Sequence, residues 1–229
     1  MSVELTVLIP CLNEKATIAE CITRASSFIK NKDVDAEIVV VDNNSTDNSV
    51  DIARQMGAKV ISEPRRGYGA ALRTGFEAAC GKYIIMGDGD CSYDFGNLDP
   101  FLERLNSGYD FVIGNRFKGK IHKNAMPFKN RYIGNPFLSL LAGYLFRIEL
   151  GDFFCGQRGI SKVAYERLKL KSSGMEFAFE MIIEAARNEL SICEIPIELH
   201  RDGRSDKPRL RPWRDGFQTL KFLISSRLH

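Results

Sequence analysis

The sequence predicts a doubly wound α/β fold, because short β-branched segments alternate with segments of helical periodicity along its first half. Residues 5–9 (LTVLI) and 37–41 (EIVVV) are hydrophobic runs typical of strands that are covered on both faces of a parallel sheet. Residues 16–29, between these runs, have apolar side chains at helical spacing. Right-handed crossovers would join such elements into a mostly parallel central sheet flanked by helices.

The alternation of strand and helix continues to about residue 113. Asp47 is a plausible N-cap, and Gly57 is a plausible stop at the end of the same helix. Asp99 and Pro100 resemble an N-cap followed by proline at the first helical position. The expected elements are a helix from Asp47 to about Met56, a strand at 59–61, a helix at 70–80, a strand at 82–86, a helix ending before Gly108 and a strand at 109–113.

The pattern changes after Gly114, where a basic loop at 115–130 is followed by an expected helix at 136–146, a polar segment at 152–159, a helix at 176–188 and a strand at 192–199. We predict one domain over residues 1–229, with halves at 1–115 and 116–213 and an amphipathic helix at 214–229. That last helix has an apolar face, so it suits either an anionic membrane surface or packing on its own domain.

Composition excludes several classes of protein. The chain has 229 residues, of which 44% are hydrophobic and 27% charged, and its net charge is +3. This surplus is too small for bulk binding to nucleic acid, so no nucleic-acid partner is expected. The six cysteines form no cluster, and the three histidines show no ligand spacing, so the histidines are expected in loops or on the surface. No apolar run reaches the ~18 residues of a membrane-spanning helix.

Polar residues follow four of the predicted strands. Ligands of open α/β sheets bind at the carboxyl ends of the strands, so four polar ends together predict a binding site. Ser45 and Asp47 are interpreted as turn or capping residues. The four ends are Pro10-Cys11-Leu12-Asn13-Glu14, Asp42-Asn43-Asn44-Ser45, Gly87-Asp88-Gly89-Asp90 and Gly114-Asn115-Arg116.

The Asp88-Gly89-Asp90 turn is the sharpest of these features. Two carboxylates separated by one small residue can hold a hard divalent cation that keeps open positions for phosphate oxygens. Asp94 is close enough in sequence to assist. The turn therefore predicts a metal site for a diphosphate ligand.

With these motifs the chain resembles the family 2 glycosyltransferases, which have the GT-A nucleotide-diphospho-sugar transferase fold. Within that family it is similar to the polyprenyl-phosphate hexose synthases of the dolichyl-phosphate mannose synthase type. The resemblance covers nearly the whole chain. Its carriers are Ile9 to Glu14, Val41 to Asp47, Gly67 to Leu72, Asp88 to Asp90, Gly114 to Phe117, Asp152 to Arg158 and the late basic loop.

The resemblance implies a donor site in the first half of the chain. Asp88 and Asp90 match the pair that holds Mg²⁺ or Mn²⁺ in the family. The other implied donor contacts are Pro10, Asn13 and Glu14 at the nucleoside, Asp42 and Asn43 at the base and ribose, and Gly67 and Gly69, where backbone approaches the donor.

The resemblance also implies an acceptor site in the second half. Arg116, Arg131 and Arg201 match arginines that receive a lipid phosphate, for which planar guanidinium groups are suited. Asp152 matches an acidic residue beside the acceptor, where it is a base or an orienting carboxylate; a cap or a partner of Arg158 is the structural alternative. Arg204, Arg209 and Arg211 in the late loop are equally well explained by acceptor contact and by solubility.

The expected activity is metal-dependent, inverting transfer of a hexose from a UDP- or GDP-sugar to a dolichyl or undecaprenyl phosphate, with Asp90, Asp152, Arg116 and Arg131 closest to the reaction. A cytoplasmic, peripheral location at the cytoplasmic membrane face follows from such an acceptor. The alternative is a saccharide hydroxyl acceptor, which needs a carboxylate base. A sugar-nucleotide sensor without catalysis also remains open, whereas a nicotinamide-dependent dehydrogenase is excluded because no glycine-rich turn follows the first strand.

Overall fold

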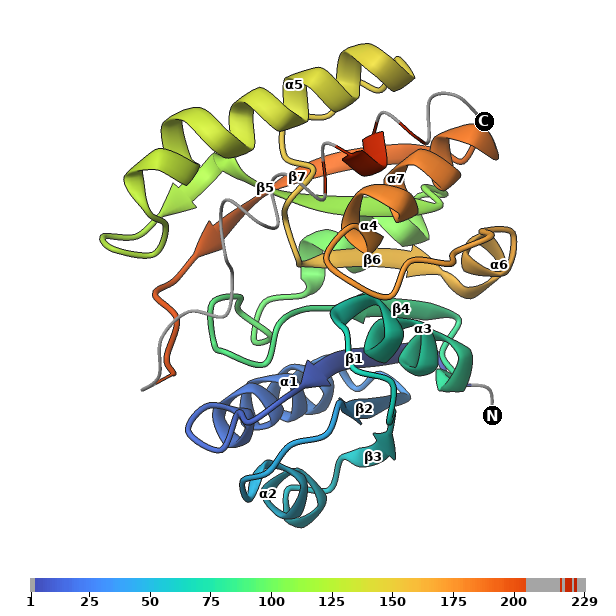
Figure 1. Cartoon of the computed structure of the whole chain (residues 1–229). Coiled ribbons are helices and arrows are strands. Elements are labelled where there is room, and N and C mark those ends of the chain that lie inside the picture. The colour runs from blue at the N-terminus through green and yellow to red at the C-terminus, as the bar shows by residue number, and fades with distance from the viewer. Residues whose placement is uncertain (1–2, 205–218, 220, 224, 226–229) are drawn as a thin grey trace.

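The computed structural model describes residues 3–204, 219, 221–223 and 225. These residues form a mixed α/β structure around a seven-stranded sheet with strand order β3-β2-β1-β4-β6-β5-β7 (Figure 1). The pairs of β1 with β2, β2 with β3, β1 with β4 and β5 with β7 are parallel, and β6 is antiparallel to both of its neighbours. The predicted mostly parallel sheet flanked by helices is confirmed.

The first half of the chain contains every element that the sequence predicts there. The second helix has Asn48 at its N-cap, one residue after the predicted cap Asp47, whose carboxylate accepts a 3.0 Å hydrogen bond from the Ser49 N–H group. The elements are β1 (Leu5–Cys11), α1 (Ile18–Lys32), β2 (Ala36–Asp42), α2 (Ser49–Gln55), β3 (Lys59–Ser62), α3 (Tyr68–Ala78), β4 (Tyr83–Met86) and α4 (Asp99–Asn106).

The second half departs from the prediction at its first strand. The loop expected at 115–130 begins only after Ile121, because β5 continues beside β7, with an irregular register between Asn115 and Lys120. Gly119 permits this pairing, since a Cβ atom there would lie 1.9 Å from the Ile197 carbonyl oxygen. The elements of this half are β5 (Phe111–Ile121), the π-helix η1 (Asn130–Gly134), α5 (Asn135–Phe146), β6 (Arg158–Ser161), α6 (Lys162–Glu166), α7 (Phe177–Arg187) and β7 (Ile192–Leu199).

The core lies on both faces of the central strands. Leu8, Ile9 and Val40 have no exposed surface, as expected for strands covered on both sides. Of the terminal helix expected at 214–229, only residues 219, 221–223 and 225 are described, and Leu223 is fully buried in the core. The rest of that predicted helix, and the loop residues Arg209 and Arg211, lie outside the described residues.

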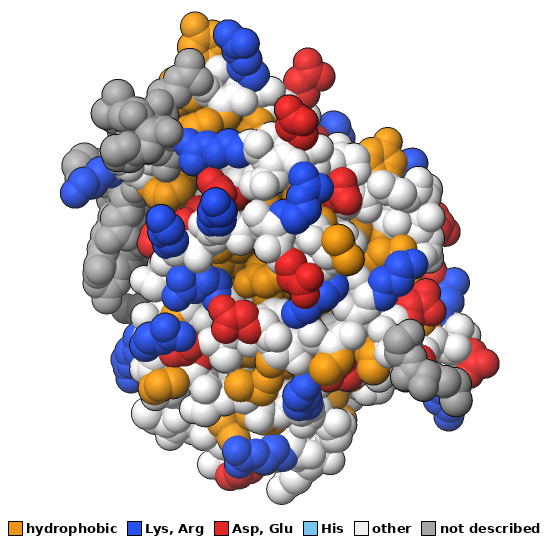
Figure 2. All heavy atoms as spheres, turned by 90° about the vertical axis from the view of Figure 1, so that its right-hand side faces the viewer, with side chains coloured by type: hydrophobic (Ala, Val, Ile, Leu, Met, Phe, Trp, Pro, Cys, Tyr) orange, Lys and Arg blue, Asp and Glu red, His pale blue; other side chains and the backbone are white. Residues whose placement is uncertain are grey.

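Neither positive nor negative side chains form a large patch on the face of the molecule shown in Figure 2. Lys and Arg side chains are interspersed there with Asp and Glu, in keeping with the net charge of +3 (Figure 2). None of the helices in the described part of the chain is both long enough and apolar enough to cross a membrane.

Candidate active site

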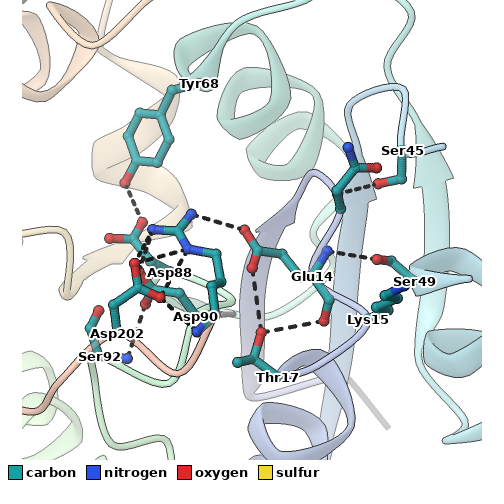
Figure 3. A network of polar contacts seen from close by, with 12 residues as sticks. Glu14, Lys15, Thr17, Ser45, Ser49, Tyr68, Asp88, Asp90, Ser92 and Asp202 are labelled. Carbon is teal, nitrogen blue, oxygen red and sulfur yellow. Dashed lines mark hydrogen bonds and ion pairs between the residues drawn. The ribbon is translucent and has the colours of Figure 1, made fainter. Parts of the chain in front are cut away.

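The loops after β1 and β2 are fastened to each other at the carboxyl edge of the sheet (Figure 3). The Asn13 N–H group donates to the Ser45 hydroxyl at 2.9 Å, and the Glu14 N–H group donates to the Ser49 hydroxyl at 2.7 Å. β1 pairs with β2 on one side and with β4 on the other, so the site lies where strand order reverses, which is the usual ligand position in this architecture.

The loop after β4 brings Asp88 and Asp90 to the same place. Asp88 Oδ1 accepts a 3.0 Å hydrogen bond from the Tyr68 hydroxyl, and Asp90 Oδ1 accepts one of 2.9 Å from the Ser92 N–H group (Figure 3). Gly156 packs directly on this turn, since a Cβ atom there would lie 2.8 Å from Asp88 Oδ2. The segment that contains Asp152 and Gly156 therefore closes against the aspartate pair.

Burial and the neighbouring charge of Asp90 raise the pKa of the Asp88 carboxyl to about 6. Burial, followed by the charge of Asp88, raises the pKa of Tyr68 well above its usual value, so the phenol keeps the proton that it donates. The turn thus concentrates negative charge that the Tyr68 hydroxyl does not neutralise. Carboxylate oxygens in this arrangement fit a hard divalent cation such as Mg²⁺ or Mn²⁺.

Arg204, from the loop after β7, lies among the carboxylates of the site with 17% of its side chain exposed. Its guanidinium nitrogens are 3.1 Å from Asp90 Oδ2, 3.3 Å from Glu14 Oε1 and 2.6 Å from Asp202 Oδ2. Sequence reasoning left Arg204 between acceptor contact and solubility, whereas the structure connects it to the donor side. Asp94, expected to assist Asp90, instead accepts the Gly96 N–H group at 2.8 Å and lies 3.6 Å from Arg24.

The Asn43 amide holds the loop that leads into α3. Its Nδ2 donates to the carbonyl oxygens of Glu63 and Arg65 at 2.9 Å, and its Oδ1 accepts the Gly67 N–H group at 2.7 Å. Asp42 Oδ1 accepts the Ser45 N–H group at 3.0 Å. The side-chain polar atoms of Asn43 therefore have partners within the chain, and its role in donor binding remains a prediction.

Gly67 and Gly69 permit close contact with the segment 172–174. A Cβ atom at Gly67 would lie 2.1 Å from the Ser173 carbonyl oxygen, and one at Gly69 would lie 2.6 Å from that of Ser172. Gly67 also has a φ of +144°, which side chains rarely adopt. These glycines thus have a packing requirement of their own, in addition to any contact with a donor.

Glu63 fixes the same loop and provides a test by pH. Hydrogen bonds from Arg65 and then from Thr74 lower the pKa of Glu63 to about 2. Its contribution to stability is therefore complete above the unfolded pKa near 4.5 and is lost as pH falls toward 2. We expect Glu63→Gln to lower the free energy of unfolding by about 1.5–3 kcal/mol at pH 7.

Urea unfolding of both proteins at several pH values checks this expectation. The difference in the free energy of unfolding between the wild type and Glu63→Gln should narrow as the pH falls from about 5 to 3. Glu103→Gln, at an exposed position of α4, should have little effect on this free energy at any pH. An equal difference at both ends of that range would contradict the assignment.

The second half of the chain contains a buried ion pair. Arg116 Nε and Nη2 each donate to one carboxylate oxygen of Asp152 at 2.7 Å, and Glu194 Oε1 accepts the N–H groups of Gly151 and Asp152. Asp152 pairs with Arg116 and not with Arg158, whose guanidinium donates to three backbone carbonyl groups. The Nε and Nη2 groups of Arg116, which could otherwise donate to a phosphate, are thus bound to Asp152.

The other predicted site residues lie apart from that pair. Arg131 is half-buried in η1, with its guanidinium carbon 5.3 Å from the centre of the Tyr132 ring. Arg201 is exposed in the loop after β7, and Pro10 is half-buried near the end of β1. The structure therefore brings together Glu14, Asp88 and Asp90, whereas the Asn13 side chain accepts the Thr46 N–H group in the loop after β2. Sequence reasoning missed Tyr68, Gly156 and Arg204 as parts of this site. The only signal for these three residues was that each lies in a segment that carries the resemblance to the family: Gly67 to Leu72, Asp152 to Arg158 and the late loop.

A doubly wound sheet with an Asp-x-Asp turn where its strand order reverses defines the class of GT-A glycosyltransferases. Residues 6–169 match the model of glycosyl transferase family 2, and the chain belongs to that family. The expected fold and enzyme class are thereby confirmed.

Two relatives from Haloferax volcanii illustrate the range of the family. The low-salt glycan biosynthesis hexosyltransferase Agl6 is 38% identical over 222 residues, which cover 96% of this chain and 53% of the relative, so the chain spans about half the length of that protein. A dolichyl-phosphate hexose transferase is 30% identical over 223 residues, which cover 96% of this chain and 92% of the relative.

Solved structures show the same fold. Glucosyl-3-phosphoglycerate synthase from Mycobacterium tuberculosis, solved with Mn²⁺, UDP and glucosyl-3-phosphoglycerate, superposes with a TM-score of 0.76 at 21% identity. The match covers 98% of this chain and 79% of that structure. Another structure of that synthase holds Mg²⁺ and UDP.

Proposed function

We propose that this protein transfers a hexose from a UDP- or GDP-sugar to a polyprenyl phosphate at the cytoplasmic face of a membrane. Residues 1–115 form the donor half in this proposal, and residues 116–213 form the acceptor half. The observation that carries the choice of acceptor is an exposed apolar surface on the acceptor half. The similarity to a dolichyl-phosphate hexose transferase over 92% of that relative agrees with it.

This surface, the α5 face, runs along the helix at the top edge of the molecule in Figure 1. Its members are 58% to 81% exposed. From Ile133 onward they recur at intervals of three or four residues, which places Ile133, Phe137, Leu140 and Tyr144 on one side of the helix. Ser139 and Ala142 are buried on the opposite side. The α5 face consists of Phe128, Tyr132, Ile133, Phe137, Leu140 and Tyr144.

An apolar surface of this kind marks a contact with a membrane or with another protein. Lys123, Lys129 and Arg147 are exposed at its two ends, and each basic residue near an anionic bilayer contributes about 1 kcal/mol of attraction. Apolar side chains flanked by cations are typical of helices that lie in the membrane interface. Arg131 lies in the same segment, in η1.

The residues on the donor side would stabilise the leaving group. Asp88 and Asp90 would hold the Mg²⁺ or Mn²⁺ ion, which as a Lewis acid supplies charge stabilisation to the departing nucleoside diphosphate. Pro10, Asn13 and Glu14 would contact the nucleoside, and Asp42 and Asn43 would contact its base and ribose. Arg204 offsets the charge of Glu14 and Asp90, so a diphosphate can approach carboxylates that would otherwise repel it.

The acceptor side needs little acid–base chemistry when the nucleophile is a phosphate, because its oxygen is already anionic at neutral pH. In-line attack on the anomeric carbon then inverts its configuration. Arg131 and Arg201 would receive the acceptor phosphate, and Arg116 would orient this half through Asp152. A saccharide hydroxyl would require a base, and Asp152, the candidate, has no exposed surface and is bound in two places by Arg116. This arrangement favours the phosphate acceptor.

A panel assay tests the proposal. The protein is incubated with labelled UDP- or GDP-hexoses and a short polyprenyl phosphate, with Mg²⁺, Mn²⁺ or a chelator. We expect label to enter the organic phase with one donor and to stay in the aqueous phase when the metal is chelated. Transfer to saccharide acceptors alone would contradict the proposal. Absence of any turnover would favour a sugar-nucleotide sensor without catalysis.

A variant of the α5 face tests the membrane contact. Leu140→Glu is expected to weaken binding to anionic vesicles about tenfold or more, because burial of a leucine side chain contributes ~1.5–3 kcal/mol. Transfer to a short, water-soluble acceptor should change less than about twofold. Val163→Glu, at an apolar position of α6 that is 73% exposed, is the matched control. Equal loss of vesicle binding in both variants would contradict a role of the α5 face.

A further inference from the structure

A second group of potential metal ligands lies at the ends of β7, an edge strand of the sheet, and of its neighbour β5. The strands are parallel, and their register pairs Ile121 with Leu199. His122 follows β5 directly, and its N–H group donates to the Leu199 carbonyl oxygen at 3.0 Å. This register brings His122 beside Glu198 and His200, although 76 or more residues separate them in the sequence.

The three side chains converge on one carboxylate oxygen. Glu198 Oε2 is 2.7 Å from His122 Nε2 and 4.0 Å from His200 Nε2. The two imidazole rings stack with their centres 4.4 Å apart. One ligand atom of each residue lies within 4.8 Å of the other two, and all three side chains are partly exposed. Two of the three histidines in the chain are thus in one cluster.

We propose that His122, Glu198 and His200 bind a Zn²⁺-type transition metal. Two imidazole nitrogens and one carboxylate oxygen form a donor set that zinc adopts when its fourth position is left to water. Zinc bonds of ~2.0–2.2 Å place neighbouring ligand atoms about 3.4 Å apart. From their distances of 2.7 Å and 4.0 Å to Glu198 Oε2, His122 Nε2 would move away by about 0.7 Å and His200 Nε2 would approach by about 0.6 Å. Side chains that are about one third to one half exposed can make that rotation without disturbing the core.

Ligand chemistry separates this site from the aspartate pair. Carboxylate oxygens alone favour Mg²⁺ and Mn²⁺, whereas imidazole nitrogen favours Zn²⁺ and Co²⁺. The cluster also borders a cavity of about 580 Å³ that Glu198 and His200 line together with Lys118 and Lys120. This cavity supplies an entry path and room for the water or anion at the fourth position.

The cluster is connected to the donor site through the backbone. The His200 N–H group donates to the Ser92 carbonyl oxygen at 2.9 Å, and the Ser92 N–H group donates to Asp90. The Gly203 N–H group donates to the Asp90 carbonyl oxygen at 2.8 Å, one residue before Arg204. A metal ion bound to the cluster would therefore restrain the loop 200–204 that carries Arg204 to the carboxylates.

Cobalt titration tests the proposal without any activity assay. The chelator-treated protein is titrated with Co²⁺, whose visible absorption reports nitrogen ligation and low coordination number, and Zn²⁺ is then added as a competitor. We expect one equivalent of Co²⁺ to bind with this absorption in the wild type. The same result is expected in Asp90→Asn, which lacks one carboxylate of the other site. His122→Ala and Glu198→Gln should each lower the affinity more than about tenfold, because even outer-shell changes cost 10–100-fold.

His229→Ala is the matched control and should bind Co²⁺ as the wild type does. Circular dichroism shows whether each variant is folded, and Glu198→Gln, at an exposed side chain, keeps the test valid if a histidine variant unfolds. The proposal is overturned by any of three results: no such absorption in the wild type, the same affinity in His122→Ala and Glu198→Gln as in the wild type, or loss of the absorption in Asp90→Asn.

Discussion

Asp90→Asn is expected to abolish metal-dependent sugar transfer, with a rate at least about 10³-fold below that of the wild type, while the protein stays folded. Asparagine has the shape of aspartate and can still accept the 2.9 Å hydrogen bond from the Ser92 N–H group. It lacks the negative charge, so one carboxylate ligand of the cation and one partner of Arg204 are lost. Transfer of labelled hexose at several Mg²⁺ and Mn²⁺ concentrations measures the first effect, and thermal unfolding measures the second.

Asp94→Asn is the matched control, because Asp94 is in the same loop and has the same charge. Its carboxylate accepts the Gly96 N–H group and lies near Arg24, so this variant should transfer sugar within about twofold of the wild type. Normal transfer by purified Asp90→Asn would show that the metal assignment is wrong. Equal losses in both variants would point to disruption of the loop instead of loss of a ligand.

The first half of the chain was predictable because its information is local. The buried runs in β1, β2 and β4 identify strands by themselves, and polar residues follow closely after each run. Once the strands are parallel neighbours, their carboxyl ends meet, so Glu14, Asp88 and Asp90 converge without knowledge of any long-range contact.

The missing parts of the site depend on contacts between distant segments. Arg204 meets Asp90 across 114 residues, and nothing in the local pattern of a basic loop distinguishes that contact from a solvated charge. The histidine cluster depends in the same way on the β5 and β7 register, which ligand spacing along the chain does not report. The extension of β5 was missed because its Gly, Asn and Lys residues resemble a loop, although they pair with an edge strand across a bulge.

The partner of Asp152 illustrates the same limit. Arg158 is nearer in sequence, but its guanidinium is buried and used by the carbonyl oxygens of Phe153, Cys155 and Ala178. Asp152 pairs with Arg116 of β5 instead. Proximity in the sequence therefore indicates the wrong arginine, because the partner of Asp152 comes from β5 and not from the nearby β6.

Asp152→Ala is expected to give a large loss of stability, roughly 3–5 kcal/mol in the free energy of unfolding. The Arg116 and Asp152 side chains are 9% and 0% exposed, so removal of the carboxylate leaves a buried guanidinium without its counter-charge. Urea unfolding followed by circular dichroism measures this loss. The double variant Arg116→Met with Asp152→Leu should recover much of it, because an apolar pair of similar size needs no desolvation of charges.

The isosteric variant Asp152→Asn separates stability from chemistry. With a phosphate acceptor no proton has to be removed, so the folded fraction of this variant should transfer hexose within about tenfold of the wild-type rate. With a hydroxyl acceptor and Asp152 as its base, the loss should reach about 10²–10⁴-fold. A loss of that second size, measured at a temperature where the variant is fully folded, would overturn the phosphate acceptor in favour of a saccharide, since only the hydroxyl reaction requires a base at this position.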